Sequence, residues 1–108
     1  YNMRSLAFLC NYLQRGSPIE NKQWEMLERE VIEKYPQFRK QVFSVIRLSL
    51  MQYRVCLLIK AGFKPTEIAQ AVGRSKSAIA NMRYRLYCRA FPGGHAKFRN
   101  WDKFILKL

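Results

Sequence analysis

Four side chains between residues 77 and 84 combine hydrogen-bonding and small apolar groups at helical spacing. Positions three and four residues apart share one face of a helix, and the stripe that they form here comprises Ser77, Ala80, Asn81 and Tyr84. Asparagine can form two hydrogen bonds with adenine, and an alanine methyl can contact the methyl group of thymine. The residue types and their spacing therefore predict direct contacts with base edges in a major groove.

Positively charged side chains flank this stripe. Residues 76–90 contain no acidic residue, and their cations are Lys76, Arg83, Arg85 and Arg89. Further upstream, Lys64 and Thr66 stand at the start of a predicted helix, and a helix N-terminus favours an anion. We expect these six residues to contact DNA phosphates.

The charge of the whole chain agrees with a polyanionic partner. The 108 residues carry 20 Lys and Arg against seven Asp and Glu, a net charge of +13. Residues 48–108 hold 12 of the cations and only two of the acidic residues. Such a charge balance predicts nucleic acid as the first candidate partner and an anionic membrane surface as the second.

Two short helices must position these side chains. Residues 67–86 read EIAQAVGRSKSAIANMRYRL, in which Gly73 ends one apolar repeat and Ser75 can cap the next. The second repeat places Ile79, Met82 and Leu86 toward the core, with the small Ala78 expected where the two helices touch. A connection of about three residues forces a steep crossing, which is helix-turn-helix geometry. The second helix, about residues 75–89, would enter the major groove.

The remaining apolar repeats also have helical periods, and the sequence shows no strand pattern, so we predict an all-α fold. We expect an N-terminal helical extension at 1–47, with helices at about 2–14, 20–35 and 37–47. A helix-turn-helix domain would follow at 48–108 and include a last helix at about 99–107. The apolar stripe of the first helix either folds back on the domain or pairs with a second chain; it comprises Met3, Leu6, Cys10 and Leu13.

Catalytic and metal chemistry have little support in the sequence. The one histidine, His95, has no nearby carboxylate or cysteine with which to form a catalytic group or a metal site. The three cysteines, Cys10, Cys56 and Cys88, lack metal-ligand spacing and are expected to be small buried hydrophobes. We therefore expect neither enzyme activity nor a cofactor.

The location and context of the chain can also be predicted. No apolar run approaches the roughly 18 residues of a transmembrane span, and a cytoplasmic location is expected. Because the chain begins with Tyr1 inside a helical pattern, we interpret it as part of a longer protein, which could be attached to a membrane through an upstream segment.

Residues 48–91 resemble the LuxR/NarL/FixJ-type (GerE) DNA-binding domain. The resemblance is carried by the run Val55–Gly62 (VCLLIKAG), by Glu67-Ile68-Ala69, and by Ser75 followed by Ala78-Ile79. It implies a four-helix, wingless helix-turn-helix domain that acts in transcription and contacts DNA through Ala80, Asn81 and Tyr84. The sequence departs from the family pattern at Gln52, Lys64, Ala78 and Met82.

The flanking segments resemble the C-terminal output end of large Bacteroidetes sensor-regulators. This second resemblance is carried by WEMLEREVIEKYPQF at residues 24–38 and by WDKFI at 101–105. It implies an upstream sensory domain, and the chain is compatible with a homodimer formed through the N-terminal or the C-terminal helix. The sequence thus predicts sequence-specific binding of double-stranded DNA by a bacterial transcription regulator.

Two alternatives from other classes remain open. A helical protein-interaction module could contact the transcription machinery in the manner of sigma-factor domains. An RNA-binding helical protein could stack exposed aromatic side chains such as Tyr84 and Tyr87 on unpaired bases.

Overall fold

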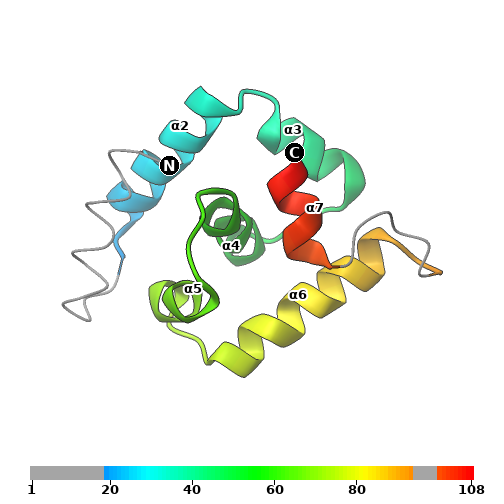
Figure 1. The fold of residues 1–108 in the computed structure, drawn as a ribbon. Coiled ribbons are helices and arrows are strands. Elements are labelled where there is room, and N and C mark those ends of the chain that lie inside the picture. The colour runs from blue at the N-terminus through cyan, green and yellow to red at the C-terminus, as the bar shows by residue number, and fades with distance from the viewer. Residues whose placement is uncertain (1–18, 94–99) are drawn as a thin grey trace.

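The computed structural model describes residues 19–93 and 100–108, and within these ranges every regular element is an α-helix. The described helices are α2 (Asn21–Lys34), α3 (Phe38–Val45), α4 (Leu50–Lys60), α5 (Pro65–Val72), α6 (Lys76–Ala90) and α7 (Trp101–Lys107) (Figure 1). The predicted all-α fold is confirmed for this part of the chain. The predicted first helix at about 2–14 lies outside the described residues.

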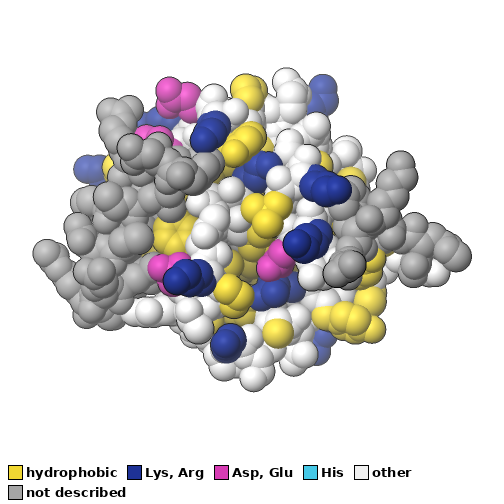
Figure 2. Space-filling view, in the orientation of Figure 1, with side chains coloured by type: hydrophobic (Ala, Val, Ile, Leu, Met, Phe, Trp, Pro, Cys, Tyr) yellow, Lys and Arg dark blue, Asp and Glu magenta, His cyan; other side chains and the backbone are white. Residues whose placement is uncertain are grey.

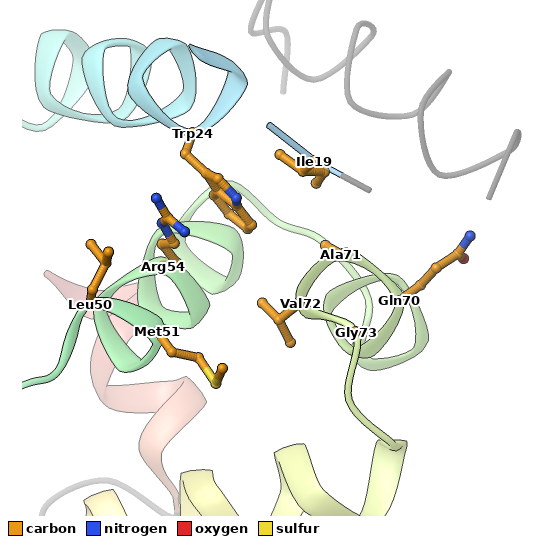
Figure 3. Close-up of a pocket in the computed structure, with 9 residues that line it drawn as sticks. All are labelled: Ile19, Trp24, Leu50, Met51, Arg54, Gln70, Ala71, Val72 and Gly73. Atoms are coloured by element: carbon orange, nitrogen blue, oxygen red, sulfur yellow. The ribbon is translucent and has the colours of Figure 1, made fainter. Parts of the chain in front are cut away.

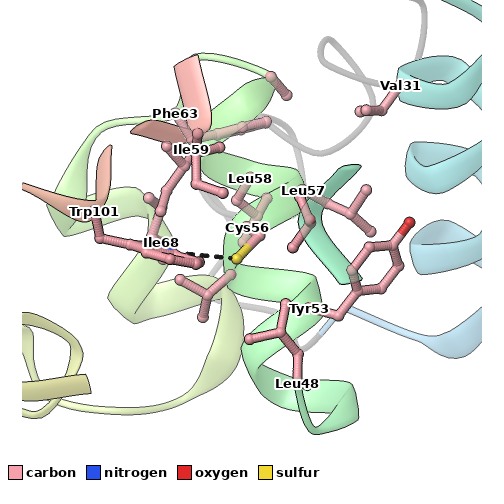
Figure 4. Packing of buried hydrophobic residues seen from close by; sticks show 14 of the residues in the cluster. Val31, Leu48, Tyr53, Cys56, Leu57, Leu58, Ile59, Phe63, Ile68 and Trp101 are labelled. Carbon is pink, nitrogen blue, oxygen red and sulfur yellow. Dashed lines mark hydrogen bonds between the residues drawn. The ribbon is translucent and has the colours of Figure 1, made fainter. Parts of the chain in front are cut away.

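Helix α4 is the central element of the bundle, and the other helices surround it (Figure 1). Every residue from Val55 to Lys60 is buried, so α4 has no solvent-facing side over its last two turns. A helix that is apolar on all sides is stable only when neighbours cover all of its faces. Figure 4 shows α4 side chains enclosed by Val31 of α2, Ile68 of α5 and Trp101 of α7.

Helices α2 and α3 contribute to the same core. The buried stripe of α2 is Trp24, Leu27 and Val31, and α3 buries Phe38 and Val42. These residues belong to one hydrophobic cluster with the buried side chains of α4 and α7. The two predicted segments on either side of residue 47 therefore share a continuous core.

Helix α3 ends two residues earlier than predicted. Ile46 has an extended backbone (φ −156°, ψ 146°), which stops the helix at Val45. The extended connection lets both Ile46 and Leu48 bury their side chains, because residues two apart on an extended chain point the same way. Tertiary burial decides this boundary, which the local sequence pattern did not show.

The junction between α5 and α6 has the turn chemistry expected from the sequence. Gly73 closes α5 with a left-handed backbone (φ 68°), a conformation that favours glycine. Ser75 caps α6, because its hydroxyl accepts a hydrogen bond from the backbone N–H of Ala78 at 3.1 Å. In Figure 1, α5 is seen nearly end-on while α6 runs across the view, so the two helices cross steeply.

Helix α7 closes the bundle against α4 and α6. Asn100 caps its start by accepting from the N–H of Lys103 at 2.9 Å, close to the predicted start at about residue 99. Trp101 is buried and its indole N–H donates to the Cys56 sulfur at 3.3 Å. Lys60 of α4 is also buried, and its ammonium group donates to the Leu106 carbonyl at 3.1 Å, near the end of α7.

Among the helices that the structure describes, none combines the length and the apolar character that crossing a bilayer requires.

Candidate nucleic-acid interface

The four residues predicted to contact bases lie together on the exposed side of α6. Ser77, Ala80, Asn81 and Tyr84 are all exposed, and the Tyr84 side chain is the most accessible large aromatic in the described chain at 70%. Ile79 and Leu86, on the other side of the helix, are completely buried. Helix α6 is thus attached by a narrow apolar face and presents the predicted stripe to solvent.

Three of the predicted phosphate contacts on α6 are exposed beside this stripe: Lys76, Arg85 and Arg89. The Arg89 guanidinium donates to the Arg47 carbonyl at 3.4 Å, which ties it loosely to the connection between α3 and α4. Figure 2 shows that Lys and Arg side chains outnumber Asp and Glu on the face drawn. With no acidic residue in α6, its exposed face is positively charged.

Arg83 has a different environment from the other α6 cations. Its Nε lies 2.9 Å from Oδ1 of Asp102 on α7, and both side chains are largely covered, with exposed fractions of 22% and 26%. That Oδ1 is buried, and the Arg83 guanidinium lies directly beside it. Burial raises the pKa of Asp102, and the neighbouring guanidinium opposes this rise only in part. Arg83 is therefore held by α7 in the isolated chain.

The two predicted phosphate contacts on α5 are exposed at the start of that helix. Lys64 precedes the first helical residue, Pro65, and Thr66 follows it. The N–H of Lys64 already donates to the Glu67 carboxylate at 2.8 Å. An incoming phosphate would therefore meet the Lys64 ammonium and the Thr66 hydroxyl rather than this N–H.

A small cavity of about 190 Å³ opens between α6 and the start of α7, directly beside the stripe. Its walls are Ala80, Arg83, Tyr84, Tyr87, Asn100, Trp101 and Asp102. The neighbouring Cys88 side chain raises the pKa of Tyr84 above its usual value. The stripe is therefore bounded on one side by a notch with an aromatic wall and a charged wall.

Two expectations about α6 are wrong. Ala78 is exposed and does not form the seam with α5; Ile79 is the buried residue of this first turn. Cys88 is also exposed rather than buried, because it lies four residues after Tyr84 and continues the exposed stripe. Cys56 is completely buried, as expected, and burial raises its pKa to about 12. Met82 is partly buried against the core.

Two residues of this region were not identified from the sequence. Arg74 is exposed in the turn just before α6 and adds a cation near its N-terminus. The sequence could have indicated Arg74, because it lies between Gly73, the predicted end of one helix, and Ser75, the predicted cap of the next. Asp102 gave no such signal, because its pairing with Arg83 depends on how α7 packs across α6.

Within residues 19–93 and 100–108, no three His, Cys, Asp or Glu side chains are arranged to hold a metal ion. His95 and Cys10 lie outside the described residues.

Comparison of the chain with protein-family models, with curated proteins and with solved structures found no match.

Proposed function

We propose that this chain is a double-stranded DNA-binding output domain of a bacterial transcription regulator, and that α6 is its recognition helix. The observation that carries the proposal is the exposed face of α6. It combines the exposed stripe of Ser77, Ala80, Asn81 and Tyr84 with flanking cations and contains no acidic residue. A major groove about 12 Å wide admits one α-helix.

The parts of α6 have separate roles in this proposal. Asn81 and Ala80 contact base edges, with Ser77 and Tyr84 completing the stripe. Lys76, Arg85 and Arg89 bind phosphates, which position the helix without specifying sequence. Lys64 and Thr66 approach a neighbouring phosphate from the start of α5. Arg83 joins these contacts only after leaving Asp102.

The proposal includes membership in the LuxR/NarL/FixJ type of helix-turn-helix domain. It is supported by Glu67, whose carboxylate accepts from the N–H of Lys64, and by the serine cap of α6. Where that family has threonine this chain has the exposed Ala78, which has no hydroxyl to make the corresponding contact. A single recognition helix reads few base pairs, so the proposed complex is a homodimer on two half-sites. An upstream sensory domain would control DNA binding by this homodimer.

The first test is selection of binding sites from random duplexes at moderate salt, followed by affinity measurements on Asn81→Ala. We expect the variant to lose about 1–3 kcal/mol of preference for the selected sequence, the usual value of one bidentate base contact. Its affinity for unrelated duplexes should change far less. Equal loss on every duplex would contradict the base-reading role of Asn81.

The same assay distinguishes the alternative functions. The high exposure of Tyr84 would suit stacking on an unpaired base, so an RNA-binding protein would prefer single-stranded RNA to duplex DNA. A protein-interaction module would bind neither tightly, even at low salt. Tight, salt-dependent and sequence-selective duplex binding is expected only from the proposed function.

A further inference from the structure

An open apolar groove lies on the side of the bundle formed by α2, α4 and α5. It has a volume of about 460 Å³ and is lined by Ile19, Trp24, Leu50, Met51, Arg54, Gln70, Ala71, Val72 and Gly73 (Figure 3). Leu50 is 64% exposed, an unusual exposure for a leucine in a chain with a well-formed core. Met51 and Val72 are only partly buried on the facing helices α4 and α5. Several large apolar side chains here thus lack complete cover among the described residues.

The groove has stable walls. The Arg54 guanidinium lies over the Trp24 ring, 5.0 Å from its centroid, and donates to the Asn21 side chain at 3.2 Å. This stacking braces α2 against α4 and turns the charged end of Arg54 away toward Asn21. The apolar stem of Arg54 and the indole remain as a wall. The groove is therefore a preformed feature of the packed helices.

We propose that this groove is the docking site of residues 3–13 of the same chain. Ile19, the first described residue, is itself part of the groove lining, so the chain leaves the described structure at the groove edge. The preceding Gly16-Ser17-Pro18 is a turn sequence. As a turn, this sequence would allow the chain to reverse direction within a few residues of Ile19.

The sequence of this segment fits an apolar groove. Its apolar residues recur at helical spacing and form one stripe, Met3, Leu6, Cys10 and Leu13. As a helix, residues 3–13 would be about 16 Å long, and an amphipathic helix binds a groove through such a stripe. Docking would cover Leu50, Met51 and Val72.

Tethering favours the same chain over a second copy. A short linker gives a millimolar effective concentration, whereas a second copy would compete at its micromolar bulk concentration. The groove also includes Gly73, the first residue of the turn into α6. The docked segment would therefore contact the junction that carries the recognition helix. The proposal does not depend on DNA binding.

Alkylation of Cys10 in a Cys88→Ser version of the full chain tests this proposal. Cys56 is buried and has a raised pKa, so labelling at neutral pH reports on Cys10. We expect Cys10 to be protected in the parent, and Leu50→Asp to accelerate its labelling about tenfold. Leu6→Asp, which leaves the groove intact, should have the same effect. Circular dichroism verifies that each variant is folded.

Leu106→Asp is the matched control, because Leu106 is 51% exposed on α7 and is not part of the groove lining. It should leave Cys10 protected. Rapid labelling in the parent, or no acceleration by Leu50→Asp, would overturn the proposal. Protection that rises with protein concentration, together with a dimeric mass in light scattering, would assign the groove to a second copy and also overturn it. All of these readouts are obtained without DNA.

Discussion

Helices α4 and α6 are the two longest helices of the second half of the chain, and they are built in opposite ways. Helix α4 buries every residue from Val55 to Lys60, whereas α6 completely buries only Ile79 and Leu86. The only charged residues of α4 are Arg54 and Lys60, and both side chains donate hydrogen bonds to other parts of the chain. Helix α6 has four cations, three of which are exposed. Helix α4 forms the centre of the core, and α6 packs against this core through a narrow apolar face.

The contrast shows how a small domain can support a charged surface. The burial around α4 supplies the stability, so α6 needs only a narrow apolar seam to remain attached. The residues on the outer face of α6 are then not constrained by packing and are available for contacts with a ligand. Substitutions in α4 should consequently affect folding, and substitutions on the outer face of α6 should affect binding.

The largest effect is expected from Leu58→Ala in α4. Leu58 is completely buried, so the free energy of unfolding should fall by about 2–5 kcal/mol through lost burial and a residual cavity. Urea denaturation measures this loss. Leu106→Ala is a matched control, with the same substitution at an exposed position of α7 outside the groove. It should cost less than about 0.5 kcal/mol. Similar losses for both variants would contradict the central role of α4.

An intermediate effect is expected from Arg85→Ala on α6. The variant should bind any duplex more weakly, and the slope of log K against log salt should become shallower by about 0.9 for the lost phosphate contact. Its unfolding curve should match that of the parent, because Arg85 is exposed. Arg29→Ala on α2 removes a similarly exposed arginine away from α6 and should not alter the slope. An unchanged slope in Arg85→Ala would remove this residue from the interface.

The smallest effect is expected from Asp102→Asn, which releases Arg83 from its partner. The affinity for duplex DNA should rise by a factor of about 1.4 to 5, since one exposed charge contact is worth about 0.2–1 kcal/mol. The parent should show a related pH dependence. Because the pKa of Asp102 is raised, lowering the pH protonates it and frees Arg83, so affinity rises. The variant should lack this component, and a lower affinity in Asp102→Asn would show that Asp102 positions Arg83 productively.

The same raised pKa has a consequence for stability. A carboxyl group that binds its proton more tightly in the folded state contributes most stability below its unfolded pKa. This contribution is lost as the pH rises through the folded pKa of Asp102. Comparing unfolding of the parent and of Asp102→Asn across this range isolates it.

Much of the local structure could be predicted because short-range chemistry determines it. Gly73 and Ser75 mark the end of α5 and the start of α6 through a backbone conformation and a hydrogen bond within a few residues. The exposed stripe of α6 follows from the helical period once Ile79 and Leu86 are assigned to the core. Cys88 and Ala78 were placed wrongly, because apolar character alone does not tell on which side of a helix a small residue lies.

The sequence alone determined the helical class of the described chain, the turn between α5 and α6, and the concentration of positive charge in the second half. These depend on composition, periodicity and neighbouring residues. Only the tertiary structure decided that Asp102 holds Arg83, that Lys60 is buried against α7, and that an apolar groove remains open beside Ile19. Each of these joins residues far apart in the chain, and their proximity arises from the packing of all the helices around α4.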